Sequence, residues 1–117
     1  MRVINFRAWD LLSKAIYPVE AINFCGRKTV TVQYNPIKKF PLDSICLMQH
    51  TGLQDENGNG IFEGDILTDG DDDYLVEFCE GKFMAVADVF ACPLSEIVDW
   101  SIVIGNQWED PEMVPNS

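Results

Sequence analysis

The sequence predicts a mainly β protein, with a β-rich N-terminal part followed by a small SH3-like barrel in the C-terminal half. Two observations support this fold class. Short segments rich in β-branched and aromatic residues recur along the chain, the clearest being TVTVQY at residues 29–34. Residues typical of tight turns separate these segments, as at Asn57-Gly58 and Glu80-Gly81.

The N-terminal elements follow from this pattern in chain order. We expect a strand at residues 3–9, a turn at 10–14, and a strand at 15–24 that is either an edge strand or bulged, because Pro18 lies within it. Gly26-Arg27-Lys28 turns the chain into the strand at 29–34. Asn35-Pro36 and Phe40-Pro41 bracket a loop, and the apolar residues 45–48 are extended.

The central run at residues 47–67, LMQHTGLQDENGNGIFEGDIL, predicts a hairpin-type turn. Asn-Gly pairs supply the positive φ angles of a type I′ turn, and the strand expected at 61–67 is kinked where Glu63-Gly64-Asp65 interrupts its apolar residues. Asp55, Asn57 and Asn59 also fit the first half of an EF-hand calcium loop. The bidentate Glu that such a loop needs is replaced by Ile66, so we predict a plain turn without metal.

The C-terminal half contains more regularly spaced elements. After the acidic turn at residues 69–73 we expect strands at 74–79 and 82–89, joined by the tight turn Glu80-Gly81. Cys92-Pro93-Leu94 ends the second strand. Ser95 is a suitable N-cap for one helical turn at 95–100, and a last strand follows at 101–105. This order is similar to an SH3-like barrel, a likeness of fold that specifies no function.

The central run also resembles the YopX family of phage- and prophage-associated proteins, in which Tyr is common at the positions of His50 and Phe62. Two further segments carry the resemblance, FRAWD at residues 6–10 and VIGNQWEDPEMV at residues 103–114. The three segments occur in the family order and span nearly the whole chain. The resemblance implies a lineage and supplies no catalytic residues, so it leaves the function open.

Charge divides the chain into two unlike parts. The 117 residues carry a net charge of -11. Residues 1–50 hold seven Lys or Arg against three acids, which gives +4, and residues 51–117 hold Lys82 against sixteen acids, which gives −15. We therefore predict a basic part at 1–50 and an acidic SH3-like part at 51–117. Direct nucleic-acid binding through the acidic part is disfavoured, because phosphate contacts need Lys and Arg.

The location and the cysteines are also constrained. No apolar run is long enough to span a membrane, and the N-terminus does not have the pattern of a signal peptide, so we expect a cytoplasmic protein of a bacterial host cell. Four cysteines without metal-site spacing are then expected to be small buried apolar residues, with no cofactor. A Cys46–His50 nucleophile pair and a zinc site are weaker alternatives.

Three classes of function remain open. The preferred one is a non-catalytic, self-assembling accessory module that forms a homo-oligomer and binds an unknown protein partner, with Trp9 and Trp108 as aromatic anchors. The second is an acidic decoy that mimics DNA through Asp71, Asp72 and Asp73 and inhibits a host nucleic-acid enzyme. The third is an unrecognised enzyme, which no catalytic pattern in the sequence favours.

Overall fold

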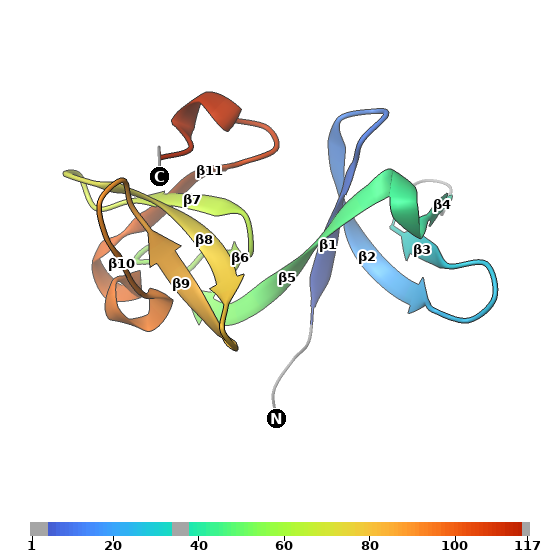
Figure 1. The fold of residues 1–117 in the computed structure, drawn as a ribbon, viewed down its shortest axis with the longest axis horizontal. Helices are drawn as coiled ribbons and strands as arrows, with labels where there is room; N and C mark the ends of the chain where they lie inside the picture. The colour runs from blue at the N-terminus through green and yellow to red at the C-terminus, as the bar shows by residue number, and fades with distance from the viewer. Residues whose placement is uncertain (1–4, 34–37, 116–117) are drawn as a thin grey trace. The chain divides into compact units, whose positions relative to one another are not determined.

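The computed structural model describes residues 5–33 and 38–115, and these form a mainly β protein (Figure 1). Strands account for 55% of these residues and short 3₁₀ helices for 11%, which confirms the predicted fold class. The first residues of the strand expected at 3–9, the end of the strand expected at 29–34, and Asn35-Pro36 lie outside the described ranges.

The strands belong to two compact units, one ending at Gln49 and the other beginning at His50. The long strand β5 (Ile45–Gln54) contributes to both, because it pairs with β1 through residues 45–49 and with β6 through His50 and Gln54. Figure 1 shows β5 in green.

The N-terminal unit is an antiparallel sheet in the order β4-β3-β2-β1-β5. Its other elements are β1 (Phe6–Asp10), β2 (Ala15–Asn23), β3 (Thr29–Val32), β4 (Lys38–Pro41) and the 3₁₀ helix η1 (Leu42–Ser44). The core is Ala8, Val30, Val32 and Ile45. In β3 the two valines are buried and the two threonines are not, as expected when side chains alternate between the faces of a strand.

Two N-terminal predictions need correction. Residues 38–41, expected in a loop, form the edge strand β4 against β3. Of the two alternatives for the Pro18 segment, the bulge is confirmed and the edge position is wrong, since β2 lies between β1 and β3. The register shifts between Val19 and Ala21, and the Pro18 carbonyl accepts a hydrogen bond from the Gln33 amide. The bulge lets a residue without an amide hydrogen occupy an interior strand.

The C-terminal unit contains a second antiparallel sheet in the order β10-β9-β8-β7-β11. Its elements are β6 (Gly60–Phe62), β7 (Asp65–Thr68), β8 (Asp73–Cys79), β9 (Lys82–Val86), β10 (Ala91–Pro93), η2 (Leu94–Glu96), η3 (Val98–Trp100), β11 (Ile102–Asn106) and η4 (Pro111–Met113). Its core includes Ile61, Leu67, Val76, Leu94 and Ile97. The strands β10 and β11 are the edges, so these pairings leave the sheet open and do not close the expected barrel.

Several C-terminal details differ from the predictions. The kinked strand expected at 61–67 is two strands, β6 and β7, because Gly64 turns the chain with a φ of 89°. The helical turn expected at 95–100 is divided into η2 and η3. Pro93 occupies the N-cap of η2, so Ser95 is not the cap.

The type I′ turn lies at a different place from the predicted one. Within the described ranges Asn57 and Asn59 do not adopt positive φ, whereas Glu80 and Gly81 have φ angles of 52° and 83°. Cys79 pairs with Lys82 across these two residues, as a type I′ hairpin requires. In the described part of the chain, no helix has the length and apolar content needed to cross a membrane.

Candidate functional site

The first of the segments that predicted the lineage forms a hydrogen-bonded loop around Asp55. The Asp55 carboxylate accepts hydrogen bonds from the amides of Asn57 (3.0 Å), Asn59 (2.8 Å) and Val103 (2.9 Å). Burial by itself raises the pKa of Asp55, but these bonds outweigh it and hold the pKa below its usual value. Asp55 thus joins the β5–β6 loop to β11, and its oxygens bind the protein's own amides.

The Gly64-Asp65 turn has a similar structural role. The Gly64 amide donates to the Val76 carbonyl (2.9 Å), and the Gly64 carbonyl accepts from the Gln107 amide (2.8 Å). The buried Asp65 carboxylate accepts from the Phe62 amide at 2.8 Å. The turn between β6 and β7 is therefore tied both to β8 and to the loop that follows β11.

The loop after β11 is ordered by Asn106. Its side-chain oxygen accepts from the amides of Trp108 (3.0 Å) and Glu109 (2.9 Å), and its side-chain nitrogen donates to the Glu109 carboxylate (2.8 Å). The motif residues around Asp55, Gly64 and Asn106 therefore maintain loop structure.

The acidic turn between β7 and β8 has one inward carboxylate and three exposed ones. Asp69 accepts from the amides of Asp72 (2.7 Å) and Asp71 (2.8 Å) and from the Tyr74 hydroxyl (2.9 Å). The bond from the Asp72 amide contributes most to lowering the pKa of Asp69. Burial, followed by the bond to Asp69, raises the pKa of Tyr74 to about 12.

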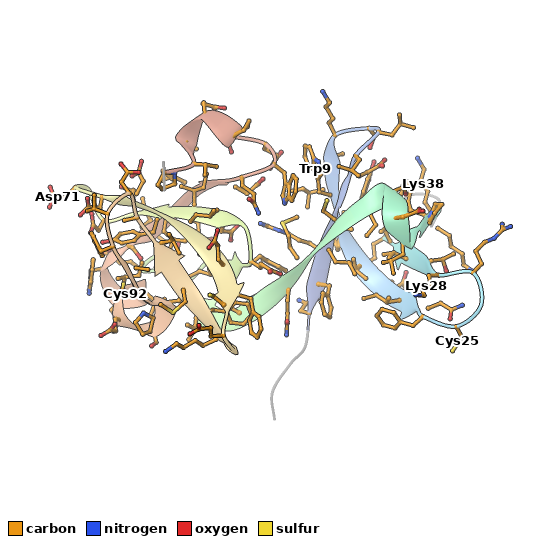
Figure 2. All side chains as sticks on the ribbon, in the orientation of Figure 1. Trp9, Cys25, Lys28, Lys38, Asp71 and Cys92 are labelled. Atoms are coloured by element: carbon orange, nitrogen blue, oxygen red, sulfur yellow. The ribbon has the colours of Figure 1, made fainter. Side chains whose placement is uncertain are left out.

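The exposed carboxylates of this turn surround a surface hollow, which we call the acidic hollow. Asp71, Asp72 and Asp73 line it together with Asp88 from the loop between β9 and β10, and its volume is about 320 Å³. Met113, Val114 and Pro115 complete the lining. Figure 2 shows Asp71 at the tip of the β7–β8 loop. The structure thus brings the three predicted aspartates together and adds a fourth.

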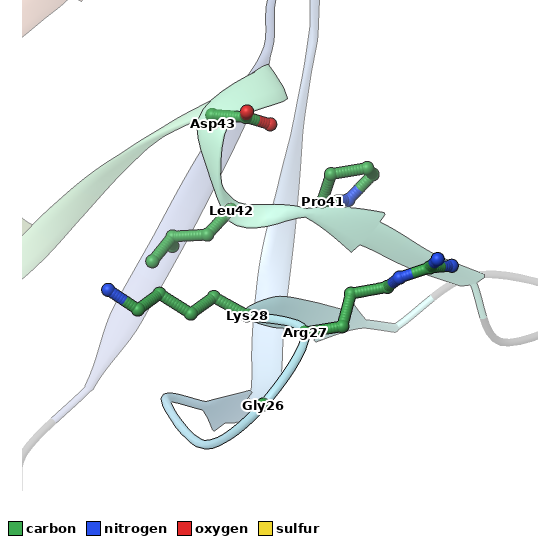
Figure 3. Close-up of a pocket in the computed structure, with 6 residues that line it drawn as sticks. All are labelled: Gly26, Arg27, Lys28, Pro41, Leu42 and Asp43. Carbon is green, nitrogen blue, oxygen red and sulfur yellow. The ribbon is translucent and has the colours of Figure 1, made fainter.

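A second hollow, the basic pocket, lies in the N-terminal unit and has a volume of about 410 Å³. Its lining residues are Gly26, Arg27, Lys28, Pro41, Leu42 and Asp43. In Figure 3, Arg27 and Lys28 extend in different directions from their turn, and Leu42 projects to the side along which Lys28 runs. The pocket combines two cationic side chains with apolar surface from Pro41 and Leu42.

The basic pocket was not predicted, because its two halves are separated in the sequence. The antiparallel pairing of β3 with β4 brings them together, and the Leu42 amide donates to the Lys28 carbonyl at 3.0 Å. The basic excess of residues 1–50 was the available signal, but it did not indicate which cations share a concave surface.

The tryptophans differ in accessibility. Trp9 is buried, with 7% of its surface exposed, and the exposed apolar side chains nearest to it in the chain are Leu11 and Leu12. Trp108 is half-buried in the loop after β11, whereas Trp100 is 49% exposed.

The prediction that the cysteines are buried is wrong. Cys25 is exposed in the turn after β2, Cys79 is exposed at the end of β8, and Cys46 and Cys92 are only half-buried. Burial raises the pKa of Cys46 and of Cys92, which disfavours their thiolate forms. Cys46 and His50 lie four residues apart on β5, a separation of about 13 Å along a strand, so they form no nucleophile pair. His50 Nδ1 instead accepts a hydrogen bond from the Gly52 amide at 2.9 Å.

Among residues 5–33 and 38–115, no group of three or more His, Cys, Asp or Glu side chains is arranged to hold a metal ion.

Comparison with known proteins identifies relatives of the whole fold. Protein EF1440 from Enterococcus faecalis is 25% identical, with a TM-score of 0.71 over 97% of this chain and 99% of its own. The yopX protein from Bacillus subtilis is 20% identical, with a TM-score of 0.63 over the same shares of the two chains. Neither name states an activity, and a search of curated proteins finds no match. The sequence matches the YopX protein family over residues 5–114, and the chain therefore belongs to that family.

Proposed function

We propose that this protein is a non-catalytic accessory module of a phage or prophage, acting in the bacterial cytoplasm through association between its own copies. One observation supports self-association most directly: each compact unit carries a surface hollow, and the two hollows have opposite charge. Arg27 and Lys28 line one beside a single carboxylate, Asp43, and four aspartates line the other. Opposite charge on two separate surfaces suits a head-to-tail contact, in which different surfaces of identical copies meet.

Charge accounts for only part of such an interaction. Exposed charges mainly accelerate encounter and fix orientation, while affinity comes from apolar side chains buried at the contact. The chain exposes suitable groups, including Leu12 and Val89. Of the two anchors predicted from sequence, Trp9 is buried and is therefore not available to a second copy, while the half-buried Trp108 stays a candidate contact.

Light scattering on the purified full chain tests the proposal. We expect an oligomer at tens of micromolar, with assembly that is slower in physiological salt than in low salt because the Debye length shortens. A strict monomer in both salt conditions would contradict self-association.

The acidic decoy is a second candidate, and the acidic hollow supports it. Asp71, Asp72, Asp73 and Asp88 place four carboxylates around one depression. If they mimic a phosphate backbone, changing Asp71, Asp72 and Asp73 to Asn abolishes capture of a host DNA-binding protein. Neutralising the exposed pair Glu96 and Asp99, which lies elsewhere on the unit, leaves capture unchanged. Equal capture by both variants would remove the support for mimicry.

A further inference from the structure

The basic pocket specifies the chemistry of its occupant. Arg27 and Lys28 supply two positive charges against the single carboxylate of Asp43, while Pro41 and Leu42 supply apolar surface within the same hollow of about 410 Å³. That volume lies in the range of about 300–1,000 Å³ typical of pockets that bind ligands. A matching occupant carries carboxylates beside an apolar group and is small enough to enter.

The loop between β9 and β10 has this combination. Val89 at its tip is 90% exposed, and the exposed Asp88 precedes it and lines the acidic hollow with three other aspartates. An exposed apolar side chain thus directly follows one of the four carboxylates of the acidic hollow. Phe78 and Trp100 are also exposed and have acidic neighbours in the chain, but they line neither the acidic hollow nor the basic pocket.

Two contacts order the same loop. The Ala87 amide donates to the Phe90 carbonyl at 2.8 Å, which closes the turn around Asp88 and Val89. The Phe90 ring packs edge-on against Tyr74, with ring centroids 5.8 Å apart. A loop ordered before binding loses little conformational entropy when it docks.

We propose that the β9–β10 loop of one copy docks into the basic pocket of a second copy. In this arrangement Val89 contacts Pro41 and Leu42, and Asp88 with the carboxylates of the acidic hollow faces Arg27 and Lys28. This inference rests on the proposed self-association and specifies its contact. Each copy carries one pocket and one loop, so the contact is heterologous and extends into a ring or a filament.

A mixing experiment with two double variants tests this contact. The pocket variant carries Arg27→Glu and Lys28→Glu, and the loop variant carries Asp88→Lys and Val89→Ser. All four side chains are exposed, and circular dichroism with thermal unfolding checks that both variants fold. The matched controls are Lys14→Glu with Lys39→Glu for the pocket, and Asp99→Lys with Trp100→Ser for the loop.

Sedimentation velocity on the full chain gives the readout. We expect each test variant alone to associate at least about tenfold more weakly than wild type, and both controls to associate like wild type. An equimolar mixture of the two test variants forms a 1:1 complex, because one intact pocket remains for one intact loop.

The other outcomes overturn the inference in distinguishable ways. A monomeric wild type rejects self-association itself and the docking with it. An oligomeric wild type whose two test variants associate normally retains self-association and rejects this contact. If association is impaired in the pocket variant but not in the loop variant, the β9–β10 loop is not the occupant. The same conclusion follows if the mixture yields no 1:1 complex.

Discussion

Asp55 connects parts of the C-terminal unit that are 48 residues apart, through its bond to the Val103 amide. The side chain is only 6% exposed, and its removal takes away the acceptor of the Asn57, Asn59 and Val103 amides. We expect Asp55→Ala to lower the free energy of unfolding by about 2–3 kcal/mol, the scale of losing hydrogen bonds to a charged group.

Urea unfolding measures this effect, and the neighbouring exposed Glu56 provides the control. Glu56→Ala leaves the free energy of unfolding within about 0.5 kcal/mol of wild type, as surface substitutions usually do. Equal stability of the Asp55 and Glu56 variants would show that the carboxylate does not hold the loop to β11.

Three carboxylates with lowered pKa values link stability to pH. The Ser13 hydroxyl, 2.6 Å away, contributes most to lowering the pKa of Asp10, and amide donors lower those of Asp55 and Asp69. A carboxyl whose folded pKa lies below its unfolded value of 3.8 stabilises the fold above that pH. Its contribution is lost as the pH falls through the lower folded value.

We therefore expect stability to decrease on acidification below about pH 4, the ordinary range of carboxyl titration. Urea midpoints at pH 5 and pH 3 measure the decrease. The Asp10→Asn variant lacks one of the carboxyls whose protonation opposes folding. The difference between its two urea midpoints is therefore smaller than in wild type. A midpoint that rises from pH 5 to pH 3 in wild type has the wrong sign for this linkage.

At the scale of elements, the β8–β9 hairpin contains a residue that is poorly suited to its conformation. Glu80 adopts a φ of 52°, in the left-handed region that disfavours most residues with a side chain. Asn tolerates this conformation and precedes Gly in the preferred type I′ sequence. Glu80→Asn should raise the free energy of unfolding by about 0.5–1 kcal/mol, a fraction of the left-handed penalty.

A second substitution at the same position provides a control with the opposite expected effect on stability. Glu80→Val introduces a β-branched residue, for which positive φ is a genuine outlier, and lowers stability. Thermal unfolding gives the midpoint of each variant relative to wild type. Equal shifts of the two midpoints in the same direction would show that backbone strain at Glu80 is unimportant.

The elements that the sequence predicted best have strong local signals. The strand at 74–79 corresponds to β8, because apolar residues lie between an acidic turn and Glu80-Gly81. By contrast β4 was missed, since Lys38, Lys39 and Pro41 are weak strand formers stabilised here by pairing with β3. The division of residues 61–67 depends on the φ of Gly64, which the neighbouring residues do not fix alone.

The candidate sites show the same dependence on local information. The sequence predicted Asp71, Asp72 and Asp73 together because they are consecutive. It did not predict Asp88, which the β8–β9 hairpin and the loop after it bring to the acidic hollow. The basic pocket was also missed, since the β3–β4 pairing and not the sequence spacing joins Lys28 to Leu42.

At the scale of the whole molecule, charge has opposite consequences for folding and for assembly. Residues from 51 onward carry sixteen acids against Lys82, so the folded C-terminal unit repels itself. Salt screens this repulsion, with a Debye length that decreases from about 30 Å at 0.01 M to about 10 Å at 0.1 M. Added salt therefore stabilises the fold while it weakens attraction between the acidic hollow and the basic pocket.

We expect the thermal unfolding midpoint to rise by a few degrees between 10 and 300 mM sodium chloride, under dilute conditions where the chain is monomeric, because screening relieves like-charge repulsion. Differential scanning fluorimetry measures the rise. Changing Asp71, Asp72 and Asp73 to Asn removes three exposed charges and reduces it, without changing the inward Asp69 that bonds to Tyr74. A midpoint that falls with salt would show that attractive charge pairs, and not repulsion within the acidic unit, dominate the electrostatics of the fold.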